Sequence, residues 1–436
     1  MRVVQLLRKL DPAEWGGTET AMQRLFQGLS EQGVTPIVYC PRLAGHAPES
    51  APFSPGCRIR RFRSFVPVIG LSRERKRQLV SVGGNLMSFQ LLSSMWREPD
   101  VSIIHTHTLG RVGGIARTVA RRRRIPLVVS IHGGVLDLPA PLQQQFNASP
   151  DHGWEWGKLF GWLFGSRHLF RDADAIVTCN RNEAKLWQQI YPAKRVVVQP
   201  HAVPLEMYRR EQRAVARAAY PQIEGRRVLL CLGRIDPVKN QAWLLEQAPA
   251  IFRQYPAALL VLAGPCTDEA YGQEIARSIR EHGLEERVLL TGGLPANDPR
   301  LVGLLQEAAA VLLPSVSETF GLVILEAWAA GAAVISSRTS GPAVLVRHGQ
   351  NGWLFDLEKP ESFHAALAQV LSNPALARQA AGLGAAACEQ YTPKAIAEQV
   401  KQLYQELVAQ QPRLNSFPDG RDAPSTLLTA AGPRET

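Results

Sequence analysis

The sequence predicts an α/β protein of two doubly wound domains, each built on a parallel sheet with helices on its faces. The length of 436 residues is that of two or three domains. Short apolar runs alternate with helical segments through most of the chain, which is typical of parallel sheets. A segment bracketed by Pro200 and Pro204 separates two such series and is typical of an interdomain linker. We therefore expect one domain over residues 1–200 and a second over residues 205–392.

The first series opens with a strand at residues 1–7, a loop, and a helix that ends at Gly33. Gly16 and Gly17 stand at the start of this helix, where glycine lets the backbone approach a ligand closely. A plain turn is the alternative, because the pair does not match the G-x-G-x-x-G fingerprint. Further strands are expected at residues 35–39, 101–106, 126–131, 175–178 and 196–198.

His132 directly follows the strand at residues 126–131 and precedes two glycines. Open α/β sheets bind ligands at the carboxyl ends of their strands, so this position favours ligand contact over a structural role. His105 and His107 end another strand and are interpreted as strand-end polar residues, because no third metal ligand is in view. Asp172 and Asp174 precede a strand instead of ending one, so we interpret them as a helix end.

The second series has strands at residues 227–232, 258–263, 288–291, 310–313 and 333–336. Arg234 and Lys239 lie in the loop after the first of these, before a helix that begins near Gln241. A guanidinium fork and an ammonium point charge can together grip a diphosphate. Two exposed bases in a loop are the alternative.

The loop after the strand at residues 310–313 carries Glu318 and leads into an apolar helix expected over residues 320–330, which ends at Gly331. The start of a helix has free backbone N–H groups and a positive dipole end, so it suits a phosphate. Glu318 and Glu326 are hydrogen-bond acceptors, and sugar hydroxyls are natural partners for them. The loop therefore fits a sugar joined to a diphosphate and a ribose, with two solvated glutamates as the alternative.

The formal net charge of +11 favours anionic partners, namely nucleic acid, phosphorylated substrates or an acidic membrane. From Arg58 to Arg77 basic side chains are interleaved with apolar ones, which predicts contact with an anionic membrane surface. A solvated basic face is the alternative. The aromatic residues 154–170 fit either core packing or a surface that faces acceptor or membrane.

Six scattered cysteines without zinc-ligand spacing indicate a reducing compartment. Arg8, Lys9 and Asp11 interrupt any apolar leader, and no stretch is long enough for a membrane span. We expect a cytoplasmic protein that can associate peripherally with the inner face of the membrane. Helices are expected at residues 361–371 and 392–407, and the polar, proline-containing residues 411–436 are expected to be a disordered tail.

Four motifs occur in order along the chain: GGTE at 16–19, IHGG at 131–134, GRIDPVKN at 233–240 and SETFGLVILEAWAAG at 317–331. With these motifs the sequence resembles the family-4 retaining glycosyltransferases of the GT-B fold, nearly to residue 410. The resemblance implies two Rossmann-like domains that face a central cleft. It implies an acceptor-side N-terminal domain, a donor-binding C-terminal domain, and a last helix, 393–410, that packs back on the first.

The resemblance also implies roles for individual residues. Arg234 and Lys239 would hold the donor diphosphate, Glu318 the hydroxyls of the donor sugar, and Glu326 the ribose diol. His132 would lie beside the transferred sugar. Backbone contacts to sugar and phosphate are implied for Gly16, Gly17, Phe320, Gly321 and Leu322.

We therefore predict a retaining, metal-independent glycosyltransferase, specifically a sugar-nucleotide-dependent hexosyltransferase. It would move a sugar from a nucleoside-diphosphate sugar to a saccharide or lipid-linked acceptor, in the biosynthesis of cell-surface polysaccharide or glycolipid. No cofactor, metal or nucleic acid is expected. The alternatives are a GT-B relative of other chemistry, such as a sugar-nucleotide epimerase or a phosphorylase, and a basic module that binds nucleic acid.

Overall fold

The computed structural model describes residues 1–10, 16–42, 56–71, 76, 86–133, 154–295 and 297–410. The chain forms two compact units, which we describe separately. One comprises Met1–Pro200 together with the chain from Lys394 onward, and the other comprises His201–Pro393. The predicted tail at residues 411–436 lies outside the described residues. No helix in the described ranges is long and apolar enough to cross a membrane.

The N-terminal unit is organised around a parallel sheet whose strand order, in the described residues, is β3-β2-β1-β5-β6-β8-β9. Its strands are β1 (Arg2–Leu6), β2 (Thr35–Pro41), β3 (Arg58–Phe62), β5 (Val101–Thr106), β6 (Leu127–Ile131), β8 (Ala175–Thr178) and β9 (Arg195–Val198). A separate antiparallel pair joins β4 (Val68–Ile69) to β7 (Trp154–Glu155). The order reverses between β1 and β5, which makes the carboxyl ends of these two strands a switch point of the sheet.

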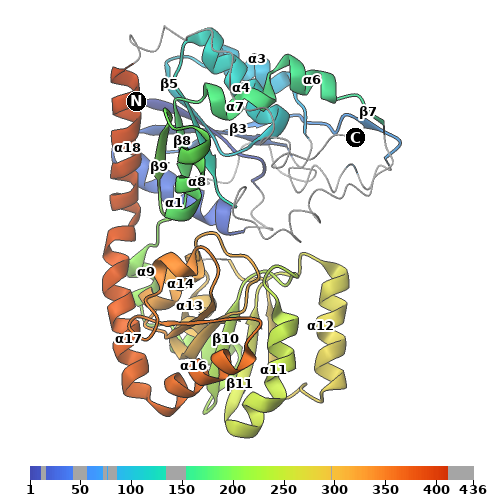
Figure 1. Ribbon diagram of the computed structural model, residues 1–436, viewed down its shortest axis with the longest axis vertical. Helices are drawn as coiled ribbons and strands as arrows, with labels where there is room; N and C mark the ends of the chain where they lie inside the picture. Colours follow the sequence, from blue (N-terminus) through green and yellow to red (C-terminus); the bar gives the residue numbers. More distant parts are fainter. Residues whose placement is uncertain are drawn as a thin grey trace. The chain divides into compact units, whose positions relative to one another are not determined.

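Helices cover both faces of this sheet. They are α1 (Gly17–Glu31), α3 (Phe89–Arg97), α4 (Gly110–Arg123), α6 (Lys158–Leu163), the 3-10 turn η2 (Ser166–His168), α7 (Leu169–Asp172), α8 (Arg181–Ile190) and α18 (Pro393–Ala409). Val4 and Leu6 share a buried cluster with residues of α3 and α4. Strand side chains alternate between faces, so Gln5 points to the opposite side, where it bonds Tyr404 of α18. Figure 1 shows α18 running along this unit.

The C-terminal unit repeats the same architecture, with strand order β12-β11-β10-β13-β14-β15 in a parallel sheet of the described residues. Its strands are β10 (Arg227–Leu232), β11 (Ala258–Ala263), β12 (Val288–Gly292), β13 (Ala308–Leu313), β14 (Val334–Ser337) and β15 (Trp353–Phe355). Numbered within the unit, this order is 3-2-1-4-5-6, that of the dinucleotide-binding Rossmann sheet. The switch point lies between β10 and β13.

Helices again lie on both faces of the sheet. They are α9 (Leu205–Arg209), α10 (Arg213–Ala219), η3 (Pro221–Ile223), α11 (Gln241–Gln254), α12 (Glu269–Glu281), α13 (Pro299–Glu307), α14 (Leu322–Ala329), α15 (Pro342–Leu345), α16 (Pro360–Ser372), α17 (Pro374–Ala387) and η4 (Cys388–Tyr391). Leu229 and Cys231 of β10 pack in a cluster with residues of α11 and α16. Figure 1 shows α11 and α12 on one side of β10 and β11, and α13 and α14 on the other.

The first five residues of the basic segment that begins at Arg58 form the edge strand β3 beside β2. The membrane contact expected for this segment stays a prediction. Arg60 lies 3.6 Å from Glu98, and Arg61 donates to the carbonyl of Leu10 at 3.3 Å. Charged residues on an edge strand hinder pairing with other chains, which gives the arginines of β3 a structural role. Arg73, Arg75 and Arg77 lie outside the described residues.

One expectation about local structure was wrong, because α14 begins at Leu322 and not at residue 320. Gly321 has a φ of 92°, a left-handed conformation that precedes the first helical residue and that only glycine adopts easily. The helix ends at Ala329, and Gly331 follows with a φ of 83°.

Candidate functional site

The loops that follow β10 and β13 are joined to each other at the switch point of the C-terminal sheet. The backbone N–H of Val316 donates to the carbonyl of Val238 at 2.9 Å. The Asn240 amide donates to the carbonyl of Pro314 at 3.2 Å. Because β10 and β13 are neighbours, both loops leave the sheet at the same edge, and these bonds hold them together.

Lys239 and Glu318 form an ion pair between the two loops. Lys239 Nζ lies 2.5 Å from Glu318 Oε2, and the backbone N–H of Gly321 donates to Oε1 at 3.1 Å. Burial by itself raises the pKa of Glu318. The Lys239 charge and the N–H groups of Gly321 and Phe320 lower this pKa by a larger amount, so the net pKa is below its usual value. Glu318 is therefore an ionised carboxylate at neutral pH, bound by a cation and by backbone donors.

Arg234 pairs with Asp236 in the same loop. Arg234 Nη2 lies 2.8 Å from Asp236 Oδ2, with the arginine side chain 46% exposed and the aspartate 8% exposed. Asp236 Oδ1 also accepts from the backbone N–H of Lys239 at 3.0 Å. One buried carboxylate thus pairs with the Arg234 guanidinium and anchors the backbone of Lys239, a role that the sequence analysis missed. The signal was the Asp-Pro pair at residues 236–237, which is typical of a turn closed by an aspartate side chain.

The Glu318 loop is held in place by close backbone contact with Gly341. The Gly341 N–H donates to the carbonyl of Glu318 at 2.8 Å. A Cβ at Gly341 would lie 2.5 Å from the backbone nitrogen of Phe320, so a side chain there would displace the loop. Leu322, whose N–H was also predicted to contact the donor, is the first residue of α14, and Glu326 lies buried one turn further on.

In the N-terminal unit, Gly16 caps α1 and Gly17 is its first residue. The N–H of Gly16 donates to Glu19 Oε2 at 3.1 Å. A Cβ added to Gly17 would meet no described atom within 4 Å, so packing among the described residues does not require a glycine there. A small hollow beside it is lined by residues that include Thr18, Glu19 and His107.

His132 lies at the carboxyl end of β6, as predicted. Its Nε2 is 2.8 Å from Nδ1 of His107, and the two rings stack with centroids 5.0 Å apart. His107 Nε2 in turn lies 2.8 Å from Gln5 Oε1. His107 directly follows β5, in accordance with its interpretation as a strand-end polar residue, but its pairing with His132 was not predicted. The sequence contained a signal for the pairing of His107 with His132, because the loops after the predicted strands 101–106 and 126–131 carry one histidine each.

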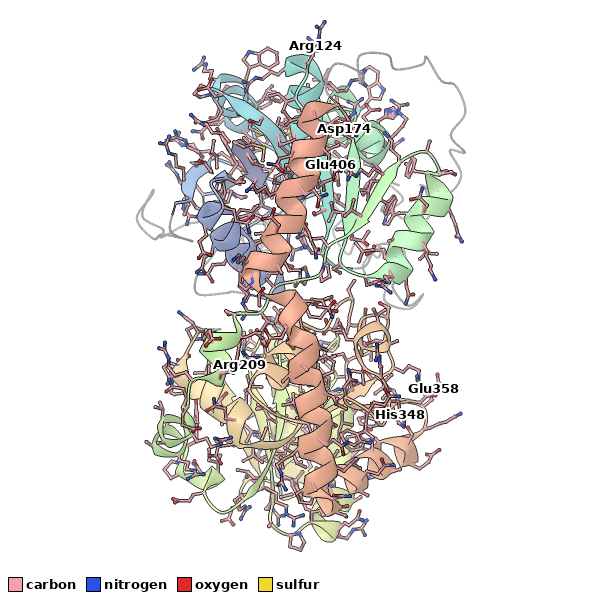
Figure 2. The ribbon with its side chains drawn as sticks, turned by 90° about the vertical axis from the view of Figure 1, so that its left-hand side faces the viewer. Arg124, Asp174, Arg209, His348, Glu358 and Glu406 are labelled. Atoms are coloured by element: carbon pink, nitrogen blue, oxygen red, sulfur yellow. The ribbon has the colours of Figure 1, made fainter. Side chains whose placement is uncertain are left out.

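The two aspartates before β8 are bound within the fold, in accordance with their interpretation as a helix end. Asp172 ends α7 and forms ion pairs with Arg117, Arg121 and Arg171. Asp174 accepts a hydrogen bond from the backbone N–H of Leu127 at 2.7 Å, and Figure 2 shows its position in the N-terminal unit.

The candidate residues thus form two groups, one in each unit, and both lie at the carboxyl ends of parallel strands. The C-terminal group brings together Arg234, Lys239, Glu318, Phe320 and Gly321. The N-terminal group comprises Gly16, Gly17 and His132. Two Rossmann-like units that carry such groups at their strand ends define a glycosyltransferase of the GT-B class, which confirms the predicted fold.

Comparison with known families matches each of the two units to a glycosyltransferase family. Residues 15–207 match the family described as "Glycosyltransferase Family 4", and residues 212–387 match "Glycosyl transferases group 1". The chain belongs to the family-4 glycosyltransferases.

Relatives match this chain by sequence, and solved structures match its fold. A D-inositol 3-phosphate glycosyltransferase of Thermobispora bispora is 27% identical over 373 residues, which cover 82% of each chain. The enzyme of that name from Mycolicibacterium paratuberculosis is 32% identical over 292 residues, 65% of this chain and 62% of the relative. Among solved structures, Anabaena Alr3699/HepE in complex with UDP-glucose has a TM-score of 0.69 at 18% identity, covering 93% of this chain and all of the other. Sucrose-phosphate synthase from Thermosynechococcus elongatus has a TM-score of 0.70 at 21% identity, covering 94% and 99%.

Proposed function

We propose that this glycosyltransferase is retaining and metal-independent, and that it takes its sugar from a nucleoside diphosphate. The observation that carries the proposal is the joined pair of loops after β10 and β13, which gathers Arg234, Lys239 and Glu318 at a sheet switch point. The UDP and UDP-glucose complexes of the Anabaena protein, which shares the fold, support a nucleotide sugar as the donor.

These residues suit the chemistry of sugar transfer. Breaking the bond between the anomeric carbon and the phosphate leaves negative charge on the departing diphosphate. Lys239 and the exposed guanidinium of Arg234 supply positive charge without a metal ion. Glu318 and Glu326 supply acceptors for hydroxyl groups of the sugar and the ribose.

Donor binding requires the ion pairs of the two loops to be rearranged in part. A diphosphate competes with Glu318 for Lys239 and with Asp236 for Arg234. Both carboxylates keep backbone donors, Gly321 for Glu318 and Lys239 for Asp236, so neither becomes an unpaired charge when its cation turns to the phosphate.

The direct test compares two arginines that have nearly the same environment. Arg217 pairs with Glu307 at 2.8 Å and is 49% exposed, but it lies on α10 near the amino end of β13. We expect Arg234→Ala to lower transfer from a nucleotide sugar by roughly 100-fold or more, the size seen when one preorganised donor is lost. Glu318→Ala should also abolish transfer while the fold survives. Near-normal turnover in Arg234→Ala would contradict the donor-site assignment, and an equal loss in Arg217→Ala would show that the effect is not specific to Arg234.

Product analysis separates this proposal from other chemistry. The protein is incubated with nucleotide sugars, with and without saccharide and lipid-linked acceptors. Because the curated relatives act on D-inositol 3-phosphate, a phosphorylated polyol is a third acceptor class to include. Nucleotide release that requires an acceptor, with a product of unchanged anomeric configuration, supports a retaining transferase. A changed sugar nucleotide formed without acceptor would instead indicate an epimerase.

We also propose that the N-terminal unit contacts an anionic membrane, where a lipid-linked acceptor is found. Helix α6 exposes Leu159, Trp162 and Leu163 by 64%, 79% and 60% of their surface. Its Phe160 ring lies 5.4 Å from that of Phe89, which is also exposed and begins α3. Exposed tryptophan and leucine suit a headgroup layer, and the net charge of +11 is complementary to acidic lipid.

Vesicle binding tests this contact with a matched control. Leu383 of α17 is also a large apolar residue, 51% exposed, but it lies in the C-terminal unit. We expect Trp162→Ser to weaken sedimentation with phosphatidylglycerol vesicles, while Leu383→Ser and neutral phosphatidylcholine vesicles show no such loss. Equal binding by Trp162→Ser and the unaltered protein would remove α6 from the membrane contact.

A further inference from the structure

The N-terminal unit contains a continuous chain of hydrogen-bonded polar side chains that reaches from His132 to α18. Successive partners lie 2.8, 2.8, 3.0, 2.6 and 2.6 Å apart. In order, its members are His132, His107, Gln5, Tyr404, His105 and Ser130.

Most of this chain is removed from water. Gln5, His105 and Tyr404 have no exposed surface, and His107 is 8% exposed. A buried polar group must find its hydrogen-bond partners inside the protein, so each member constrains the next. The six side chains include no carboxylate, and the rings of His105 and His107 are 4.2 Å apart, so a positive charge on either ring is disfavoured. Burial accordingly lowers the pKa of His105 to about 3.

The direction of the bonds follows from Gln5. Its Nε2 donates to the hydroxyl of Tyr404, so its Oε1 accepts from Nε2 of His107. A neutral histidine carries one ring proton, so Nδ1 of His107 has none and accepts from Nε2 of His132. His132 therefore has its proton on Nε2, and its Nδ1 is an acceptor.

The other half of the chain is consistent with this direction. Having accepted from Gln5, the Tyr404 hydroxyl donates its proton to Nδ1 of His105. His105 then carries its proton on Nε2 and donates to Oγ of Ser130. Between His132 and Gln5 one bond cannot reverse alone, because a neutral His107 has a single ring proton and Gln5 has a single amide oxygen.

We propose that Tyr404 of α18 is a positioning residue for His132 and acts through Gln5 and His107, which hold His132 as the Nε2–H tautomer. The inference rests on the proposed function only in that His132 lies beside the transferred sugar. The tautomer itself is a property of the protein without substrate.

The first test reads the tautomer by NMR of protein labelled with ¹⁵N-histidine, with the His132 signal identified by its loss in His132→Gln. The test variant is Tyr404→Phe, which leaves Gln5 without the hydroxyl that orients its amide. The control is Tyr39→Phe, because Tyr39 is also buried and donates to Glu98 at 2.8 Å, outside this chain. We expect one Nε2–H form in the unaltered protein and in Tyr39→Phe, and a mixture of both forms in Tyr404→Phe. A single unchanged form in Tyr404→Phe, or an Nδ1–H form in the unaltered protein, would overturn the proposal.

A second pair of variants acts directly on the neighbour of His132. His107→Asn keeps an acceptor oxygen near the position of Nδ1, whereas His107→Leu has none. We expect the Asn variant to retain the Nε2–H form and the Leu variant to lose it. The same result in both variants would contradict the assignment even if Tyr404→Phe were poorly folded.

Turnover provides the functional readout. We expect Tyr404→Phe to lower kcat about tenfold, as loss of an outer hydrogen-bond partner does for metal-bound histidines, while Tyr39→Phe changes it less than about twofold. An equal fall in both tyrosine variants would indicate a general loss of stability and would contradict positioning. If no variant transferred sugar but the tautomer changed as expected, the proposed reaction would be wrong and the positioning role would stand.

Discussion

At the scale of single residues, the buried histidine His105 makes the stability of the protein depend on pH. Burial lowers its pKa to about 3, from about 6.5 in an unfolded chain. The unfolded state therefore binds a proton first as the pH falls, so the free energy of unfolding decreases below pH 6.5 and continues to decrease toward pH 3. Each unit of pH in this window costs about 1.4 kcal/mol at most.

Denaturant unfolding between pH 7 and pH 4 measures this effect. The slope of unfolding free energy against pH measures the number of protons taken up on unfolding. We expect His105→Gln to lower this number by about one, whatever the effect of the substitution on stability at pH 7. His282→Gln is the control, because His282 is exposed at the end of α12. Parallel pH profiles for the unaltered protein and His105→Gln would show that His105 is not the buried neutral group described.

The sequence predicted where the candidate residues lie in the fold better than it predicted which side chains they pair with. Arg234, Lys239 and Glu318 could be predicted at one edge of a sheet, because each follows an apolar run that reads as a strand. The pairing of Lys239 with Glu318 depends on β10 and β13 being neighbours, and strand order is set by contacts distant in the sequence. Tyr404 lies 299 residues beyond His105, so helical periodicity alone could not assign it to the same network.

At the scale of elements, the loop before α14 depends on one glycine from the loop after β14. We expect Gly341→Ala to destabilise the protein by about 1–3 kcal/mol, the usual cost of overpacking, because its Cβ would lie 2.5 Å from the backbone of Phe320. Displacing this backbone should also weaken binding of a nucleoside diphosphate. Melting temperatures with and without nucleotide measure both effects.

Gly382→Ala is the matched control for this prediction. Gly382 lies in α17, and an added Cβ would meet no described atom within 4 Å. Alanine in a helix interior is favoured over glycine by about 0.5–1 kcal/mol, so this variant should be slightly more stable and should bind nucleotide normally. If the two variants behaved alike, the close contact at Gly341 would have no bearing on the site.

The elements that the sequence did not predict have identifiable causes. Strand β3 reads Arg-Ile-Arg-Arg-Phe and has few apolar positions, because it forms the edge of its sheet and needs less burial. The late start of α14 depends on the left-handed backbone of Gly321, which apolar periodicity does not indicate. The central strands were predicted closely because strands buried on both faces appear as continuous apolar runs.

At the scale of the whole molecule, two units with the same Rossmann-like strand order each present candidate residues at the carboxyl ends of their strands. The fold class and the family were predictable from the sequence, because the motifs and the alternation of strands and helices extend over both units. The identity of the donor base and of the acceptor was not predictable, because these depend on side chains outside the motifs.

The most direct test of the proposed donor site is the melting temperature of the protein with UDP, GDP, ADP, dTDP or CDP, each with and without EDTA. A ligand that binds only the folded state stabilises it, by about 2.7 kcal/mol at roughly 100 times its Kd. We predict that one nucleotide raises the melting temperature, that EDTA leaves the increase unchanged, and that Lys239→Ala removes most of it. No increase with any nucleotide, or an increase that EDTA abolishes, would contradict a metal-independent donor site built from Arg234, Lys239 and Glu318.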